Sequence, residues 1–247
     1  MISNMHHSAA RTCFFAVLFA LFGNTSLLHA EAVQTEALQT ENLQAADLQV
    51  EEVQKPQYPE TIAVLQMLYG GEVRARYRYL EFAKVAKADG HDNIAYLFKA
   101  IAHSEAVHEK NFKGILEKLG TTAANVDLSS IKISTTKENL KYATEVELSE
   151  IDTEYPRYIQ RVGPEKHPEA IEFINYAWEA ERQHRELIKE IQSGTGMFFS
   201  MLLEHFRKDD SVYYVNQNCG ATVTELPLDD CPICHKPLDT YTVVPAP

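Results

Sequence analysis

The chain has 247 residues, of which 45% are hydrophobic and 23% charged, and a net charge of −12. This length allows one or two globular domains with a buried core. The acidic balance excludes a nucleic-acid-binding protein, because phosphates require a basic surface, and it argues against adsorption to anionic lipid.

Residues 1–32 are typical of a secretory signal peptide. Arg11 precedes an apolar run over 13–22 that is too short to span a bilayer as a mature helix, and Ala30-Glu31-Ala32 is a small-x-small cleavage site. We expect cleavage after Ala32 or Ala30, rather than an uncleaved anchor. The mature protein is then exported, periplasmic if the source is a Gram-negative bacterium, with no stable membrane insertion.

A five-residue repeat of an apolar residue followed by glutamine occupies residues 33–54, and Pro56 and Pro59 come directly after it. Five short copies cannot bury much apolar surface, which argues against a pentapeptide solenoid. We predict a polar linker over residues 33–58.

Apolar residues recur at helical spacing in four later segments. We predict helices over Thr61–Ala88, Asp92–Leu119, Thr136–Val162 and Pro168–Gln192. Pro156 lies inside the third segment and is expected to kink that helix or end its regular part. The polar stretch 123–136 is predicted to be the long crossover of a four-helix bundle over residues 59–196. A connecting segment, 197–210, follows.

Residues 211–247 have a different character. Two stretches typical of β-strands, Tyr213–Val215 and Tyr241–Val244, flank Cys219, Cys231 and Cys234. This domain is too small to fold by apolar burial alone, and an odd number of cysteines fits a disulfide framework poorly. The pattern indicates a metal site, or a free thiol beside one disulfide.

The chemistry of the bundle is indicated by two E-x-x-H motifs, each of which follows an upstream glutamate at nearly the same separation. They are Glu105/His108 after Glu72, and Glu181/His184 after Glu147. Residues at i and i+3 lie on one face of a helix, so each motif aims a carboxylate and an imidazole at one point. Glu147 and Glu150 form a further i, i+3 pair.

Carboxylates that converge in a core repel one another and lose their hydration. Two divalent cations would offset both effects, and mixed carboxylate and imidazole ligands suit iron or manganese better than zinc or calcium. The alternative is that these are solvated surface glutamates. The repeated motif, placed on predicted helices, favours the metal site.

With these motifs the chain resembles the rubrerythrins, from about Thr61 to the C-terminus. The matching residues are Gly71-Glu72, Arg78-Tyr79, Glu105-x-x-His108, Asn139-Leu140, Glu147-x-x-Glu150, Tyr155-Pro156 and Glu181-x-x-His184. The resemblance implies a mainly α protein: a ferritin-like four-helix bundle with a non-haem di-iron site and a small C-terminal rubredoxin-like β domain.

The resemblance also implies a role for each ligand. Glu72 and Glu147 would be terminal ligands, and Glu105 and Glu181 would bridge the two iron ions. His184 would bind one iron, and His108 and Glu150 would serve the other. In rubrerythrins this second iron is held by the histidine when reduced and by the extra glutamate when oxidised. That switch is physically reasonable, because a ferric pair prefers a harder anionic ligand.

Further expectations follow from the same resemblance. Tyr79 and Tyr155 match tyrosines that hydrogen-bond to ligating carboxylates, although both could equally be core aromatics. The implied reaction is the reduction of hydrogen peroxide to water with electrons from an external donor that the sequence does not identify. A homodimer is also implied.

The tail departs from the family pattern. Rubredoxin-like domains hold one iron ion in two C-x-x-C knuckles. Here Cys231 and Cys234 form the second knuckle, but Asn216 stands where the first would begin, three residues before Cys219. The tail could bind iron through three thiolates with Asn216 or water, or zinc with His235, or it could hold no metal and oxidise two thiols.

Because one thiolate is missing, the sequence does not show how the di-iron site of the bundle would be re-reduced. The alternative function is a ferritin-like protein that binds or oxidises iron without peroxidase turnover. A structural zinc-binding or interaction protein is a further alternative.

Overall fold

The computed structural model describes residues 56–192 and 212–247, except the side chains of residues 146–150 and 189–192. The predicted signal peptide, nearly all of the predicted linker and the segment 193–211 lie outside the described residues.

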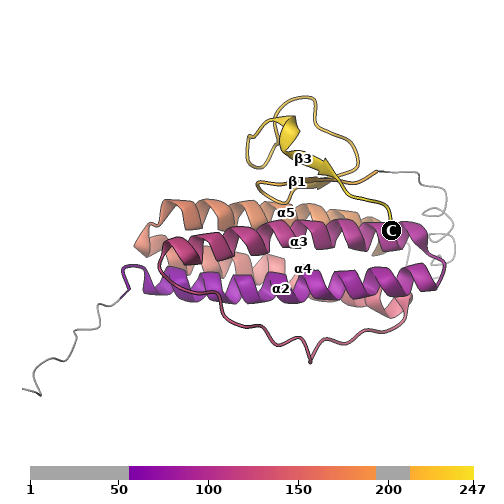
Figure 1. Ribbon diagram of the computed structural model, residues 1–247, viewed down its shortest axis with the longest axis horizontal. Coiled ribbons are helices and arrows are strands. Elements are labelled where there is room, and N and C mark those ends of the chain that lie inside the picture. The colour runs from indigo at the N-terminus through magenta and orange to yellow at the C-terminus, as the bar shows by residue number, and fades with distance from the viewer. Residues whose placement is uncertain (1–55, 193–211) are drawn as a thin grey trace, which may run out of the picture. The chain divides into compact units, whose positions relative to one another are not determined.

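Four long helices form the first described part: α2 (Pro59–Ala88), α3 (Asp92–Lys118), α4 (Thr136–Val162) and α5 (Pro168–Gln192). Helix α2 packs along α3, and α4 packs along α5. The long connection between α3 and α4 carries the chain from the first pair to the second (Figure 1). This arrangement confirms the predicted ferritin-like four-helix bundle.

Local sequence signals explain the helix ends. Thr135 caps α4 with a capping box, in which its hydroxyl accepts a hydrogen bond from the Glu138 backbone N–H while the Glu138 carboxylate accepts one from the Thr135 backbone N–H. Pro59 begins α2, and Gly90, with a φ of 79°, follows its end. Helix α4 continues through Pro156 to Val162, so the proline does not end it. Asp152, whose carbonyl loses its helical partner, is exposed and can be hydrated.

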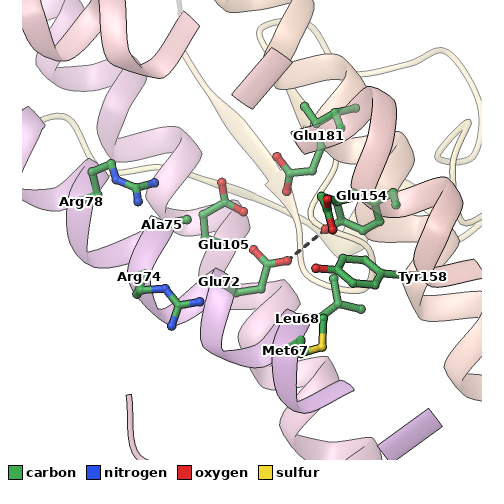
Figure 2. A pocket seen from close by; sticks show the side chains of 13 residues that line it. Met67, Leu68, Glu72, Arg74, Ala75, Arg78, Glu105, Glu154, Tyr158 and Glu181 are labelled. Atoms are coloured by element: carbon green, nitrogen blue, oxygen red, sulfur yellow. Dashed lines mark hydrogen bonds between the residues drawn. The ribbon is translucent and has the colours of Figure 1, made fainter. Parts of the chain in front are cut away.

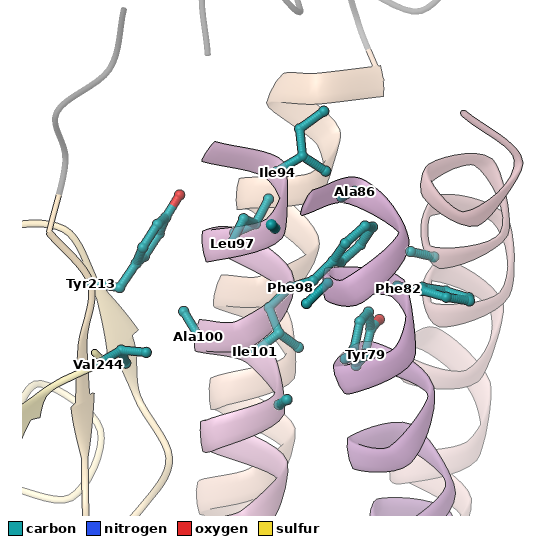
Figure 3. Packing of buried hydrophobic residues seen from close by; sticks show 14 of the residues in the cluster. Tyr79, Phe82, Ala86, Ile94, Leu97, Phe98, Ala100, Ile101, Tyr213 and Val244 are labelled. Carbon is teal, nitrogen blue, oxygen red and sulfur yellow. The ribbon is translucent and has the colours of Figure 1, made fainter. Parts of the chain in front are cut away.

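The bundle core has two apolar clusters at different levels. One contains Tyr79, Phe82, Phe98 and Ile101, and the other contains Leu65, Phe112, Ile115 and Ile174. Each fully buried large side chain contributes roughly 1.5–3 kcal/mol. The first cluster extends to Tyr213 and Val244 of the C-terminal part, which pack on the side of α3 (Figure 3).

The C-terminal part is a three-stranded antiparallel sheet in the order β2-β1-β3, built from β1 (Tyr214–Asn216), β2 (Thr222–Val223) and β3 (Tyr241–Val243). The predicted strands correspond to β1 and β3, and the two-residue β2 was not predicted. Tyr96 of α3 donates a hydrogen bond from its hydroxyl to the Val244 carbonyl at 2.6 Å. Among the described helices, none has the length and apolar character needed to cross a membrane.

Candidate metal centre

A group of acidic side chains and histidines lies buried in the middle of the bundle. Helix α2 supplies Glu72, α3 supplies Glu105 and His108, and α5 supplies Glu181 and His184. All five residues are at most 6% exposed. Both residues of each E-x-x-H motif face the interior of the bundle, as their i, i+3 spacing predicts.

The two histidines turn the same ring nitrogen toward the carboxylates. His108 Nδ1 lies 3.1 Å from Glu105 Oε2 and 3.1 Å from Glu181 Oε1. His184 Nδ1 lies 2.9 Å from Glu181 Oε2. Both Nδ1 atoms are thus placed to bind a cation together with the carboxylates.

The opposite ring nitrogens face the C-terminal part. His108 Nε2 lies 3.1 Å from the Cys219 carbonyl oxygen, and His184 Nε2 lies 3.1 Å from Thr222 Oγ1. A histidine that donates its second N–H in this way keeps the other nitrogen free for a metal.

Residues 218–222, which we call the cover loop, contact the bundle beside these two histidines. The buried Ser104 hydroxyl donates to the Gly220 carbonyl at 2.6 Å, and the Asn111 amide donates to the Asn218 carbonyl at 2.8 Å. Gly220 has a φ of 81°, and a Cβ atom there would lie 2.2 Å from His108 Nε2. Only glycine allows this approach.

The electrostatics of the cluster favour bound cations. Burial, followed by the charge of Glu181, raises the pKa of Glu105 well above its usual value. Burial opposes the protonation of His108, but the hydrogen bonds that its ring donates to Glu105, Glu181 and Glu72 together raise its pKa well above the usual value. Burial also acts against ionised Glu181, but His184 and His108 lower its pKa.

The ligand atoms fit a metal. One ligand atom from each of Glu72, Glu105, His108 and Glu181 lies within 4.8 Å of the others. Glu181 Oε1 is buried and lies 3.1 Å from His108 Nδ1. Carboxylates buried this close together need positive charge beside them, which bound metal ions would supply together with His108. The cluster suits a di-iron site, because its donors are carboxylate oxygens and imidazole nitrogens.

The two predicted ligands on α4 are Glu147 and Glu150. Their backbone belongs to this helix, but their side chains lie outside the described residues.

The predicted tyrosines differ in their surroundings. Tyr155 donates a hydrogen bond from its hydroxyl to Glu72 Oε1 at 3.1 Å. Burial and the charge of Glu72 raise its pKa well above the usual value, so the hydroxyl keeps its proton. Tyr79 packs against Phe82 and Phe98 in the apolar cluster, with ring centroids 6.1 Å and 5.8 Å away.

A cavity of about 350 Å³ opens onto the carboxylates. Figure 2 shows the carboxylates of Glu72, Glu105 and Glu181 turned toward one another from different helices, with Arg74 and Arg78 along α2. Met67 and Leu68 add apolar surface to the wall. Small molecules therefore have space beside the ligand atoms.

The three cysteines of the tail also come together. Cys219, Cys231 and Cys234 are buried, and their sulfur atoms lie within 4.8 Å of one another. The group could bind a metal ion. His235 is exposed, has a φ of 53° and is not part of the group.

The contacts of the cover loop could not be predicted from the sequence. Ser104, Asn111 and Thr222 were not predicted to have any role at the site. The one available signal was Gly220, next to a predicted ligand cysteine, because glycine often marks a close backbone approach.

The fold and the cluster define a ferritin-like bundle protein with a non-haem di-iron site. The rubrerythrin family model matches residues 63–192. Rubrerythrin-2 of Clostridium acetobutylicum is 31% identical over 183 residues, which is 73% of this chain and 95% of the relative. The chain belongs to the rubrerythrin family.

Three further comparisons agree. Nigerythrin of Nitratidesulfovibrio vulgaris is 25% identical over 182 residues, 74% of this chain and 85% of the relative. The structure of fully reduced, all-ferrous nigerythrin superposes with a TM-score of 0.62 at 25% identity, over 74% of this chain and 86% of that one. Bacterioferritin of Desulfovibrio desulfuricans, with a TM-score of 0.55 and 18% identity over 61% of this chain and 88% of that one, shares the fold. Family membership supports a general oxidoreductase.

Proposed function

We propose that this protein reduces hydrogen peroxide to water at a di-iron centre, with electrons from an external donor. The observation that carries the proposal is the buried cluster of Glu72, Glu105, Glu181, His108 and His184, which lies beside a cavity that small molecules can enter. Two ferrous ions held there would supply the two electrons that convert one peroxide and two protons into two waters.

The ligand roles are part of the proposal. Glu72, Glu105, Glu147, Glu181 and His184 would hold the two metal ions, with Glu105 and Glu181 as the ligands that both ions would share. His108 and Glu150 would serve one ion, the histidine in the reduced state and the glutamate in the oxidised state. The support is the E-x-x-H geometry and the family membership of the chain.

The surrounding residues orient these ligands. Tyr155 holds one oxygen of Glu72 by a hydrogen bond, so this carboxylate has a fixed direction before a metal binds. The cover loop fixes both imidazole rings through Cys219 and Thr222. The apolar clusters on either side limit bulk water, which strengthens the electrostatic interactions inside the cluster.

The test compares two oxidants. The purified protein is loaded with iron, reduced without oxygen and mixed rapidly with either hydrogen peroxide or oxygen. The proposal expects fast oxidation by peroxide and a much slower reaction with oxygen. Glu181→Gln should lose iron and the reaction together, whereas Glu154→Gln, which changes a cavity residue outside the cluster, should keep both.

A second candidate is iron binding and oxidation without peroxidase turnover. The observation in its favour is Asn216, which replaces a thiolate in the domain that supplies electrons in the family pattern. In this case oxygen would oxidise the bound iron quickly and peroxide slowly.

We also propose that the chain is exported after cleavage near Ala32, and that it acts as a homodimer. The support for export is the sequence pattern of residues 1–32. N-terminal sequencing of the protein from its native source tests the cleavage, since a retained Met1 would contradict it. Sedimentation of the mature protein tests the dimer.

A further inference from the structure

The tail holds a potential fourth ligand among its three cysteines. Asn216 is completely buried, and its Oδ1 atom lies 3.7 Å from Cys234 Sγ. Cys219 Sγ and Cys231 Sγ are 3.6 Å apart. The amide oxygen thus occupies the place that a first-knuckle thiolate would take.

The orientation of the amide is fixed by its hydrogen bonds. Oδ1 accepts from the backbone N–H groups of Asn218 at 2.9 Å and Cys219 at 3.2 Å. Nδ2 donates to Thr240 Oγ1 at 2.7 Å, and that hydroxyl donates onward to the Pro237 carbonyl. A flipped amide would turn N–H groups toward two N–H donors, so the oxygen must face the cysteines.

Two separations, Cys219 Sγ–Cys231 Sγ and Asn216 Oδ1–Cys234 Sγ, match those of a tetrahedral metal site. Metal–sulfur bonds of about 2.3 Å place two sulfur ligands about 3.8 Å apart, and a metal–oxygen bond of about 2.1 Å places oxygen about 3.6 Å from sulfur. The observed distances are 3.6 Å for the two sulfur atoms and 3.7 Å for oxygen and sulfur. A disulfide would instead need sulfur atoms about 2.05 Å apart.

We propose that Cys219, Cys231, Cys234 and the Asn216 side-chain oxygen together bind one divalent metal ion, Zn²⁺ or Fe²⁺. The inference concerns the tail alone and stands whether or not the bundle reduces peroxide. His235 does not compete, because its exposed side chain lies outside the cluster.

The neutral ligand changes what the site can do. With three thiolates and an amide, a ferrous site carries one negative charge, whereas four thiolates give it two. The smaller negative charge stabilises the ferric ion less, so this site keeps its metal divalent and is a poorer one-electron carrier than a four-thiolate site. Its role is then to hold the cover loop, which includes the ligand residue Cys219, against His108.

Cobalt provides a sulfur-specific test. The full-length protein is reduced without oxygen and loaded with Co²⁺, and thiolate-to-cobalt charge transfer is measured in the near ultraviolet. The bundle does not contribute to this absorption, because its ligands are carboxylates and imidazoles. The proposal expects one tetrahedral cobalt ion with three thiolates per tail.

Two variants test whether a thiol binds the metal specifically at residue 216 or wherever one is added nearby. Asn216→Cys should raise the charge-transfer intensity by about one third, from three thiolates to four. Gln217→Cys is the matched control, since it adds a thiol at the neighbouring exposed position and should leave the spectrum unchanged. After loading with iron and oxidation, the Asn216→Cys variant should show a rubredoxin-like visible absorption band that the natural sequence lacks.

A small added thiol then distinguishes asparagine from water at the fourth position. If Asn216 is the ligand, the cobalt spectrum stays unchanged on adding 2-mercaptoethanol. A fourth thiolate band after this addition would show an open position and overturn the assignment. The absence of any thiolate–cobalt band in the reduced protein would also overturn it.

Discussion

The contact between the cover loop and His108 can be tested by adding one methyl group. In Gly220→Ala the new Cβ would lie 2.2 Å from His108 Nε2 and 2.7 Å from Ser104 Oγ. Both neighbours are buried side chains of α3, so neither can swing into solvent to make room. The loop must therefore move away from the histidine, or the histidine must leave its position.

The cost has two parts. Alanine in the left-handed conformation at a φ of 81° costs about 1–2 kcal/mol. Overpacking of a close contact costs about 1–3 kcal/mol more. The free energy of unfolding should therefore fall by about 2–5 kcal/mol, unless the loop detaches locally and relieves the clash.

Gly90→Ala is the matched control, because Gly90 has a φ of 79° but no atom within 4 Å of its added Cβ. Urea unfolding and amide hydrogen exchange over residues 218–222 measure both outcomes. We expect Gly220→Ala to lose more stability than Gly90→Ala, or to show faster exchange in the cover loop. Equal stability and equal exchange in the two variants would refute the contact.

The other predictions concern the bundle. Tyr155→Phe removes the hydrogen bond to Glu72, so the free energy of unfolding should fall by about 0.5–1.5 kcal/mol. Stopped-flow absorbance should also show slower oxidation by peroxide, at nearly unchanged iron content. Glu150→Ala should slow the peroxide reaction more than it lowers iron content; equal losses would make this residue an ordinary ligand. The hydrogen bond from the Thr136 hydroxyl lowers the pKa of Asp89, so this contact stabilises the fold above the unfolded pKa of 3.8 and the effect is lost as pH falls through the lower folded pKa. Asp89→Asn should therefore flatten the acid limb of the stability curve, and an unchanged limb would contradict the contact.

Helix positions could be predicted from the sequence because their signals are local. The predicted bounds Thr136–Val162 and Pro168–Gln192 agree with the structure, and α2 begins two residues before the predicted Thr61. Capping residues, glycines and apolar periodicity all act within a few residues. Pro156 shows the limit of such rules, because a helix can pass through a proline where the freed carbonyl is exposed.

The convergence of the ligands was predictable for a related reason. Each E-x-x-H motif needs only the helical repeat to place both side chains on one face, and a bundle then brings the two faces together. The hydrogen bond from Tyr155 to Glu72 joins residues 83 positions apart. It was expected only from the family resemblance.

The cover loop could not be predicted, because its contacts are long-range. Cys219 and His108 are 111 positions apart, and no periodic pattern connects them. The hydrogen bonds of Asn216 depend in the same way on a folded knuckle. A sequence shows that a thiolate is missing, but only the structure shows an amide oxygen held 3.7 Å from Cys234 Sγ by two backbone N–H groups.

The most direct test of the central claim is an anaerobic titration of the iron-loaded, fully reduced protein with hydrogen peroxide, followed by Mössbauer spectroscopy. We predict two iron ions per bundle, both of which become ferric after one equivalent of peroxide. A bundle without iron, or iron that stays ferrous with peroxide and is oxidised rapidly only by oxygen, would contradict the account.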